Sequence, residues 1–208
     1  MSKAPDVNAA YASDSPDALI DLYEAWAETY DTNFKDAQGY MLHVIVAQAF
    51  VRAGGTGPIL DVGAGTGLVA EELAKQDLTD VDALDLSADM LKVAEQKQLY
   101  QGLFEGDVTQ PLTNLTRRYM GVVSAGTFTH GHVGPNGLDA LLDATDIGAV
   151  FALSINHQHF EALGFKAKFA ELAPLISDYT EADIRIYTDQ ADEDHRHDLA
   201  RIVTFKRA

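Results

Sequence analysis

A glycine-rich turn constrains the fold of this chain more than any other feature. Its sequence is Asp61-Val62-Gly63-Ala64-Gly65-Thr66-Gly67. An apolar run typical of a buried strand, 58–62, comes directly before it, and a segment with helical periodicity, 66–75, follows. Glycine lets the backbone turn tightly and approach a ligand without a Cβ in the way. The unit therefore predicts an α/β fold that binds a ligand at the carboxyl end of this strand.

Predicted strands and helices alternate over the rest of the chain. Further strands are predicted at 81–86, 103–106, 119–125, 149–155, 184–187 and 199–205, and further helices at 88–98, 137–144 and 159–175, the last with a break at Gly164. This alternation favours a doubly wound, mostly parallel sheet of seven strands with helices on both faces. The last two strands are joined only by an acidic turn, 189–198. They must pair antiparallel, because a parallel crossover needs roughly a dozen residues or more.

Two helices are predicted before the first strand. Helical periodicity covers 17–29 and 40–53, and Gly54-Gly55 ends the second helix. A chain of 208 residues suits one compact domain. We therefore expect an N-terminal helical cap or lid, 1–53, on a single ligand-binding domain, 54–208.

Composition excludes several classes of function. Asp and Glu number 32 against 15 Lys and Arg, and the net charge of -17 repels nucleic-acid phosphates. The absence of cysteine excludes disulfides, zinc–thiolate sites and thiol catalysis. Residues 1–11 lack the apolar core of a signal peptide, and the apolar segment 44–51 is too short to span a bilayer. We expect a cytoplasmic protein that acts on a small molecule, with the oligomeric state left open.

The spacing of the glycines separates two kinds of nucleotide-cofactor site. The dinucleotide fingerprint is Gly-x-Gly-x-x-Gly. Here the third glycine, Gly67, comes one residue early, and Leu68 stands at the last position of the fingerprint. Gly-x-Gly-x-Gly preceded by an acid resembles the first motif of class I S-adenosylmethionine-dependent methyltransferases. The resemblance implies a Rossmann-like fold, S-adenosylmethionine as the cofactor and methyl transfer as the reaction.

Two more carboxyl groups follow the next two predicted strands. A carboxylate at Asp85 can accept hydrogen bonds from both hydroxyls of a ribose, with Leu86 and Met90 offering apolar surface to the adenine. The resemblance implies that Asp107 accepts from the adenine amino group and that the amide of Val108 meets the ring. Each acid alone could equally be a cap or a turn residue. Three acids and a glycine turn on one edge of a sheet favour a binding site.

The methionine end of the cofactor is expected to lie near the fourth strand and the N-terminal helices. The resemblance implies that a carbonyl after the fourth strand, that of Ala125, holds the methionine amino group. Tyr23 and Tyr30, with Trp26, are candidates for a lid over the sulfonium, although the same rings could form the core of an amphipathic helix. The expected cofactor-binding residues are Tyr23, Tyr30, Asp61, Gly63, Ala64, Gly65, Gly67, Asp85, Leu86, Met90, Asp107, Val108 and Ala125.

Three segments resemble a narrower family. They are Tyr23-Glu24-Ala25-Trp26-Ala27-Glu28-Thr29-Tyr30-Asp31, then 59–70, and Leu99-Tyr100-Gln101. Together they are similar to the Williams–Beuren-region methyltransferase-like family, over about residues 23–126. One departure is Met120, which stands where an acid is usual before the fourth strand.

Methyl transfer from a sulfonium is an in-line displacement that mainly requires alignment and exclusion of water. A general base is needed only if the acceptor has a proton to lose. His130 and His132, in a segment that follows the fourth strand, are candidates for that base, although a loop histidine is more often simply solvated. Asn156 and His157, after the fifth strand, are a second acceptor-side candidate.

Six of the seven histidines fall in His-x-His pairs, 130/132, 157/159 and 195/197. Metal ligands must converge in space, and alternating residues on a strand point to opposite faces, so no metal site is expected. Two other functions stay open. One is an NAD-dependent oxidoreductase, against which the position of Gly67 counts, and the other is a sensor that binds S-adenosylmethionine or its product without turnover.

Overall fold

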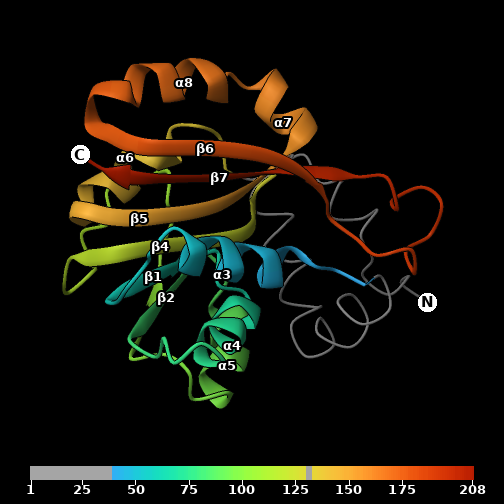
Figure 1. Ribbon diagram of the computed structural model, residues 1–208. Helices are drawn as coiled ribbons and strands as arrows, with labels where there is room; N and C mark the ends of the chain where they lie inside the picture. The colour runs from blue at the N-terminus through green and yellow to red at the C-terminus, as the bar shows by residue number, and fades with distance from the viewer. Residues whose placement is uncertain (1–38, 130–132) are drawn as a thin grey trace.

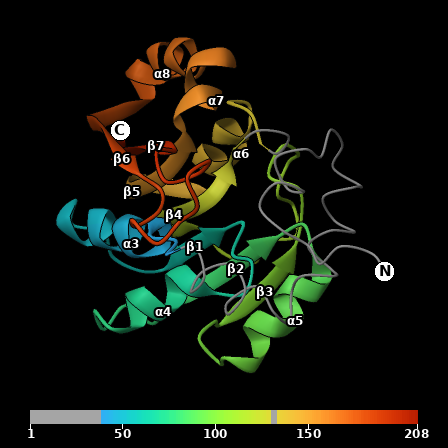
Figure 2. The same cartoon turned by 90° about the vertical axis from the view of Figure 1, so that its right-hand side faces the viewer.

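One seven-stranded sheet organises the part of the chain that the computed structural model describes, residues 39–129 and 133–208 (Figures 1 and 2). The strands are β1 (Ile59–Val62), β2 (Val81–Asp85), β3 (Gly102–Glu105), β4 (Tyr119–Phe128), β5 (Thr145–Asn156), β6 (Ile176–Arg185) and β7 (Leu199–Arg207). The helices are α3 (Leu42–Arg52), α4 (Leu68–Ala74), α5 (Ala88–Gln96), α6 (Gly137–Asp143), α7 (His157–Ala162) and α8 (Phe165–Leu172), followed by a 3-10 turn, η2 (Ala173–Leu175).

The strand order is β3-β2-β1-β4-β5-β7-β6. From β3 to β5 every pair is parallel, whereas β7 lies between β5 and β6 and is antiparallel to both. The predicted mostly parallel sheet with an antiparallel last strand is confirmed. The carboxyl ends of β1, β2, β3 and β4 therefore share one edge of the sheet, where the glycine turn lies.

The helices cover the sheet on both faces, because successive strand residues point to opposite sides. On β1, Ile59 joins the core beneath α3 and α4, whereas Leu60 joins the core beneath α6, α7 and α8. The second core is rich in phenylalanine, with Phe151 stacked on Phe205 at 4.4 Å between ring centroids. Burial of these two apolar layers supplies the main driving force for folding.

Two elements differ most from their predicted extents. The strand predicted at 184–187 corresponds to β6, which begins earlier, at Ile176. The earlier part was not predicted because this edge strand is exposed and lacks the apolar alternation of a half-buried strand. The helix predicted at 159–175 is two helices, separated at Gly164, whose backbone is left-handed with φ +80°. The predicted break at Gly164 is confirmed.

The connection from β6 to β7 packs against the entry to α3. Tyr40 and Tyr187 form an isolated antiparallel bridge, and the amide of Thr188 donates to the carbonyl of Gly39 at 2.9 Å. Within this connection His195 is buried, and its Nδ1 lies 3.0 Å from Asp198 Oδ2. The start of α3 is thereby fixed beside the site edge of the sheet.

We expect Gly121→Ala to destabilise the fold. A Cβ at Gly121 would stand 2.4 Å from Cζ of Phe50, which is fully buried under α3, and 3.0 Å from the carbonyl oxygen of Thr56. Overpacking of this kind costs about 1–3 kcal/mol of unfolding free energy, measurable by urea unfolding. Gly134→Ala is the matched control, because within residues 39–129 and 133–208 its Cβ would meet only Leu163 Cδ1, at 4.0 Å. Equal stability of the two variants would contradict the close packing of α3 on β4.

Candidate functional site

A cavity of about 220 Å³ opens at the carboxyl ends of β1, β2, β3 and β4. Nine of the residues expected to bind the cofactor line it: Gly63, Ala64, Gly65, Asp85, Leu86, Met90, Asp107, Val108 and Ala125. They come from four separate segments of the chain, one near the end of each of β1, β2, β3 and β4. The structure therefore brings together side chains and backbone that lie more than sixty residues apart in sequence.

The glycine turn is left-handed at all three of its glycines. Gly63, Gly65 and Gly67 have φ of +63°, +54° and +94°. Such backbone favours glycine, since a Cβ is strained there. A Cβ at Gly63 would also stand 1.9 Å from Thr127 Oγ1, whereas one at Gly65 would meet no atom of the described residues within 4 Å. Gly65 thus leaves open space in the cavity wall, as a bound cofactor requires.

Asp85 closes the turn from the neighbouring strand. Its Oδ2 accepts from the amide of Gly65 at 2.7 Å and its Oδ1 from the amide of Ser87 at 2.9 Å. Burial raises the pKa of Asp85, and these backbone hydrogen bonds oppose that shift. Leu86, beside it, is 41% exposed, and Met90 is buried. Both line the cavity with apolar surface.

Asp107 and Val108 form the wall after β3. Asp107 Oδ1 accepts from both the amide and the hydroxyl of Thr109, at 2.8 and 2.7 Å, which holds the carboxyl group in place. Val108 is buried and belongs to the core on the α6 side. Asp107 and Val108 both line the cavity.

The end of β4 is fastened to β1 and β5. The hydroxyls of Ser124 and Thr127 both donate to the carbonyl of Val62, at 2.8 and 2.9 Å. The amide of Gly126 donates to Ser154 Oγ at 3.0 Å. Ala125, Gly126 and Thr127 line the cavity as a result.

The structure does not bring Asp61 or Gly67 to the cavity wall. Asp61 is fully buried behind the turn, and its Oδ2 accepts from the hydroxyl of Tyr100 at 2.7 Å. Its Oδ1 has no hydrogen-bond partner among the described residues. A Cβ at Gly67 would stand 3.2 Å from the Tyr100 ring. Asp61 and Gly67 therefore both lie against Tyr100, behind the turn.

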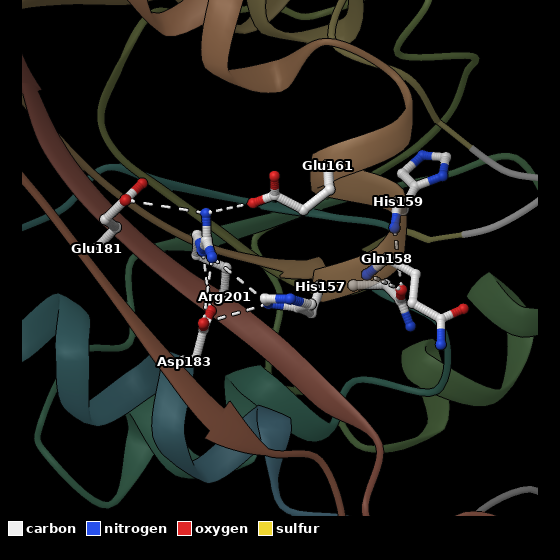
Figure 3. Close-up of polar contacts among 8 residues, drawn as sticks. His157, Gln158, His159, Glu161, Glu181, Asp183 and Arg201 are labelled. Carbon is white, nitrogen blue, oxygen red and sulfur yellow. Dashed lines mark hydrogen bonds and ion pairs between the residues drawn. The ribbon is translucent and has the colours of Figure 1, made fainter.

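His157 lies outside the cavity, on the side of α7 that faces β6 and β7. Its Nδ1 is 3.2 Å from Asp183 Oδ2 and 3.4 Å from the Arg201 guanidinium (Figure 3). Arg201 also pairs with Glu161 and lies 4.3 Å over the ring of Phe160. The hydrogen bond from Arg201 is the main reason why the pKa of Asp183 lies below its usual range. This cluster fastens α7 to β6 and β7.

Asn156 and His159 also have structural partners. The Asn156 side chain caps α7 by accepting from the amides of Gln158 and His159. His159 is buried, and its Nε2 lies 3.0 Å from the carbonyl oxygen of Val133. Val133 lines the cavity. Asn156 and His157, the second acceptor-side candidates, are therefore not part of the cavity wall.

Tyr40 and His43 also line the cavity, and neither is among the residues expected from the sequence analysis. Both are buried, and their rings stack at 5.6 Å with an interplanar angle of 8°. Tyr40 precedes α3 and is held by its bridge to Tyr187, whereas His43 lies in the first turn of α3. No local pattern marks the pair, because the bridge that brings Tyr40 to the cavity joins residues that are distant in sequence.

Four of the expected site residues lie outside the described residues. They are Tyr23, Tyr30, His130 and His132, and Trp26 lies outside as well. Among residues 39–129 and 133–208, no three metal-binding side chains gather in one place. None of the helices in these ranges has the length and apolar character needed to cross a membrane.

Comparison with known proteins agrees with this geometry. Residues 59–146 match the model of a family described as a methyltransferase domain. That match begins at β1 and includes the glycine turn, Asp85 and Asp107. No curated protein matches the chain.

Several solved structures share the fold. NodS, an N-methyltransferase from Bradyrhizobium japonicum WM9 in complex with S-adenosylhomocysteine, is 12% identical with a TM-score of 0.67, covering 90% of this chain and 97% of NodS. An S-adenosylmethionine-dependent methyltransferase from Clostridium acetobutylicum is 16% identical with a TM-score of 0.59. The match covers 89% of this chain and 99% of that methyltransferase. DesVI from Streptomyces venezuelae is 25% identical with a TM-score of 0.50, covering 62% of this chain and 56% of DesVI.

The family match and the fold point to one class of protein. Residues 59–146 match a methyltransferase domain, and the sheet has the Rossmann-like fold of solved methyltransferases that use S-adenosylmethionine as their cofactor. The open space above Gly65 and the carboxyl groups of Asp85 and Asp107 in one cavity fit that cofactor.

We expect Asp61→Asn to remove part of the pH dependence of stability. Burial raises the pKa of Asp61 from 3.8 to about 7, so between these values the folded state holds a proton that the unfolded chain releases. The Asp61 contribution to stability is complete below pH 3.8 and is lost as the pH rises through 7. Asparagine cannot ionise. The variant should therefore gain stability relative to the wild type between pH 5 and pH 8, measured by urea unfolding at about these two values.

Tyr100→Phe serves as the counterpart in the same measurement. The Tyr100 hydroxyl donates to Asp61 and lowers its pKa, so its removal should raise that pKa and extend the loss of stability to higher pH. Parallel stability profiles for the wild type and both variants would show that Asp61 keeps an ordinary pKa.

Proposed function

We propose that the protein transfers the methyl group of S-adenosylmethionine to a small-molecule acceptor. One observation carries the proposal: a single cavity joins the glycine turn to Asp85 and Asp107 at the carboxyl edge of the sheet. The net charge of -17 supports a small acceptor over nucleic acid, because a negative surface repels phosphates. Residues 59–146 supply the methyltransferase domain that the proposal requires.

The adenosine half of the cofactor is assigned to β2 and β3. Asp85 accepts from the two ribose hydroxyls, and Leu86 and Met90 pack on the adenine. Asp107 accepts from the adenine amino group, and the amide of Val108 meets the ring. The support for these roles is that all five residues line one cavity.

The methionine half is assigned to β1 and β4. Gly63, Ala64 and Gly65 leave room for the chain of the cofactor, and the carbonyl of Ala125 accepts from its amino group. Asp61 and Gly67 keep the turn in shape from behind, through Tyr100.

The remaining roles fall on residues outside the described ranges. We propose that Tyr23 and Tyr30 close over the sulfonium, as part of a cap formed by residues 1–53 on the domain 54–208. His130 or His132 takes a proton from the acceptor where the acceptor has one to lose. The proposal includes two further points. Segments 23–31 and 99–101 are similar to the Williams–Beuren-region methyltransferase-like family, and the protein acts in the cytoplasm.

The cofactor supplies an activated methyl group whose leaving group departs uncharged. The protein therefore needs no nucleophile of its own. Its task is to align the acceptor with the methyl group and to exclude water from the site. Turnover is tested by a screen of small-molecule acceptors that measures release of S-adenosylhomocysteine. Binding of the cofactor without release for any acceptor would favour a sensor.

We expect Asp85→Asn to weaken binding of S-adenosylhomocysteine by about tenfold or more, because hydrogen bonds to a charged group contribute about 1.5–3 kcal/mol. Isothermal titration calorimetry measures the effect. Asp89→Asn is the matched control, since Asp89 pairs with Lys92 on α5 and does not line the cavity. Unchanged affinity in Asp85→Asn would remove this residue from the ribose site.

A further inference from the structure

Asp61 is a buried carboxyl group that uses only part of its hydrogen-bonding capacity. It is fully buried at the carboxyl end of β1, on the side of the sheet that α3 and α4 cover. Its Oδ2 accepts from the Tyr100 hydroxyl at 2.7 Å, whereas its Oδ1 has no hydrogen-bond partner among residues 39–129 and 133–208. A buried carboxylate needs several donors or a cation to replace its lost hydration. This environment therefore favours the protonated, neutral carboxyl group.

The ionisable groups around Asp61 come from three other elements. Asp85 follows β2 in the cavity wall, and α3 contributes His43 to the same wall. Glu71 on α4 is paired with Lys97 at 2.6 Å, which offsets its charge. Burial, and to a smaller extent the charge of Asp85, raises the pKa of Asp61 to about 7. Asp61 is consequently divided between its neutral and its charged form near neutral pH.

Asp61 lies close enough to the cavity to respond to a charge bound there. Gly63, two residues further on, lines the cavity, and two residues of chain span at most about 7 Å. At an effective dielectric constant of about 20, a unit charge within about 12 Å changes a pKa by about one unit or more. A cation bound against the glycine turn therefore favours the charged form of Asp61. An uncharged ligand does not, because Asp61 is already fully buried and loses no further hydration.

The two forms of the proposed cofactor differ in this charge. S-adenosylmethionine has a positively charged sulfonium, and S-adenosylhomocysteine has a neutral thioether with the same adenosine and the same amino-acid tail. We propose that Asp61 makes the site selective for the sulfonium form by releasing its proton when that form binds. The inference rests on the proposed function and adds a specificity-determining residue behind the cavity wall.

The proton that Asp61 releases passes to the solvent, and the carboxylate that remains attracts the sulfonium. Methyl transfer leaves the electron pair of the broken bond on the sulfur, which is then neutral. Asp61 takes a proton back from the solvent, and the product loses this attraction. The same carboxyl group thus favours binding of the substrate form and release of the product form.

The test measures proton uptake or release directly. Isothermal titration calorimetry of both ligands is carried out at pH 6, 7 and 8 in two buffers of different ionisation enthalpy. The affinity for S-adenosylmethionine relative to S-adenosylhomocysteine should rise by about three- to tenfold from pH 6 to pH 8. At pH 7, S-adenosylmethionine should release roughly three to five tenths of a proton more than S-adenosylhomocysteine does. The comparison isolates the sulfonium, because the rest of the two ligands is identical.

Two variants identify the group that carries the proton. Asp61→Asn cannot ionise, so it should bind S-adenosylhomocysteine and lose both the pH dependence of the affinity ratio and the difference in proton release. Tyr100→Phe removes the donor that lowers the pKa of Asp61, so the rise of the ratio should move to higher pH. Asp89→Asn is the control, since Asp89 pairs with Lys92 on α5 and should behave as the wild type does.

Two results would overturn the inference. One is an affinity ratio in the wild type that does not change with pH. The other is an unaltered pH dependence in Asp61→Asn, which would assign the proton to a different group, such as His43 in the cavity wall. If the wild type bound neither ligand at any pH, the proposed function itself would fail.

Discussion

The site depends on one constraint, the attachment of the glycine turn to the neighbouring strand. The carbonyl of Leu84 accepts from two amides of the turn, and the carboxyl group of Asp85 accepts from a third. These bonds force the backbone into left-handed conformations that only glycine adopts without strain. The turn is therefore rigid before any ligand arrives, and the side chain of Asp85 has a structural role as well as a place in the cavity.

The sheet provides the frame for that attachment. Because β1 is central and β2 and β4 lie on either side of it, the ends of three strands meet the same cavity. Hydroxyls of Ser124 and Thr127 fasten β4 to the last carbonyl of β1. The polar bonds at the edge are buried between two apolar layers, which keeps water from competing for them.

Much of this arrangement could be predicted from the sequence, because it depends on local signals. Glycines at fixed spacing mark the turn, and acids directly after apolar runs mark strand ends. The role of Asp61 could not be predicted, since its burial depends on Tyr100, which is distant in sequence. Tyr40 and His43 were missed for a similar reason, because the bridge from Tyr40 to Tyr187 places the start of α3 at the cavity. The length of β6 was hidden by its exposed, polar composition.

That exposed margin has a consequence for how the molecule behaves in a crowded solution. β6 is one of the two edge strands of the sheet, and it carries the charged residues Asp178, Glu181, Asp183 and Arg185. A strand from another chain that paired there would have to desolvate these charges, at a cost that backbone hydrogen bonds do not recover. The sheet therefore ends at β6 by its chemistry, and the protein resists the edge-to-edge association that leads to aggregates.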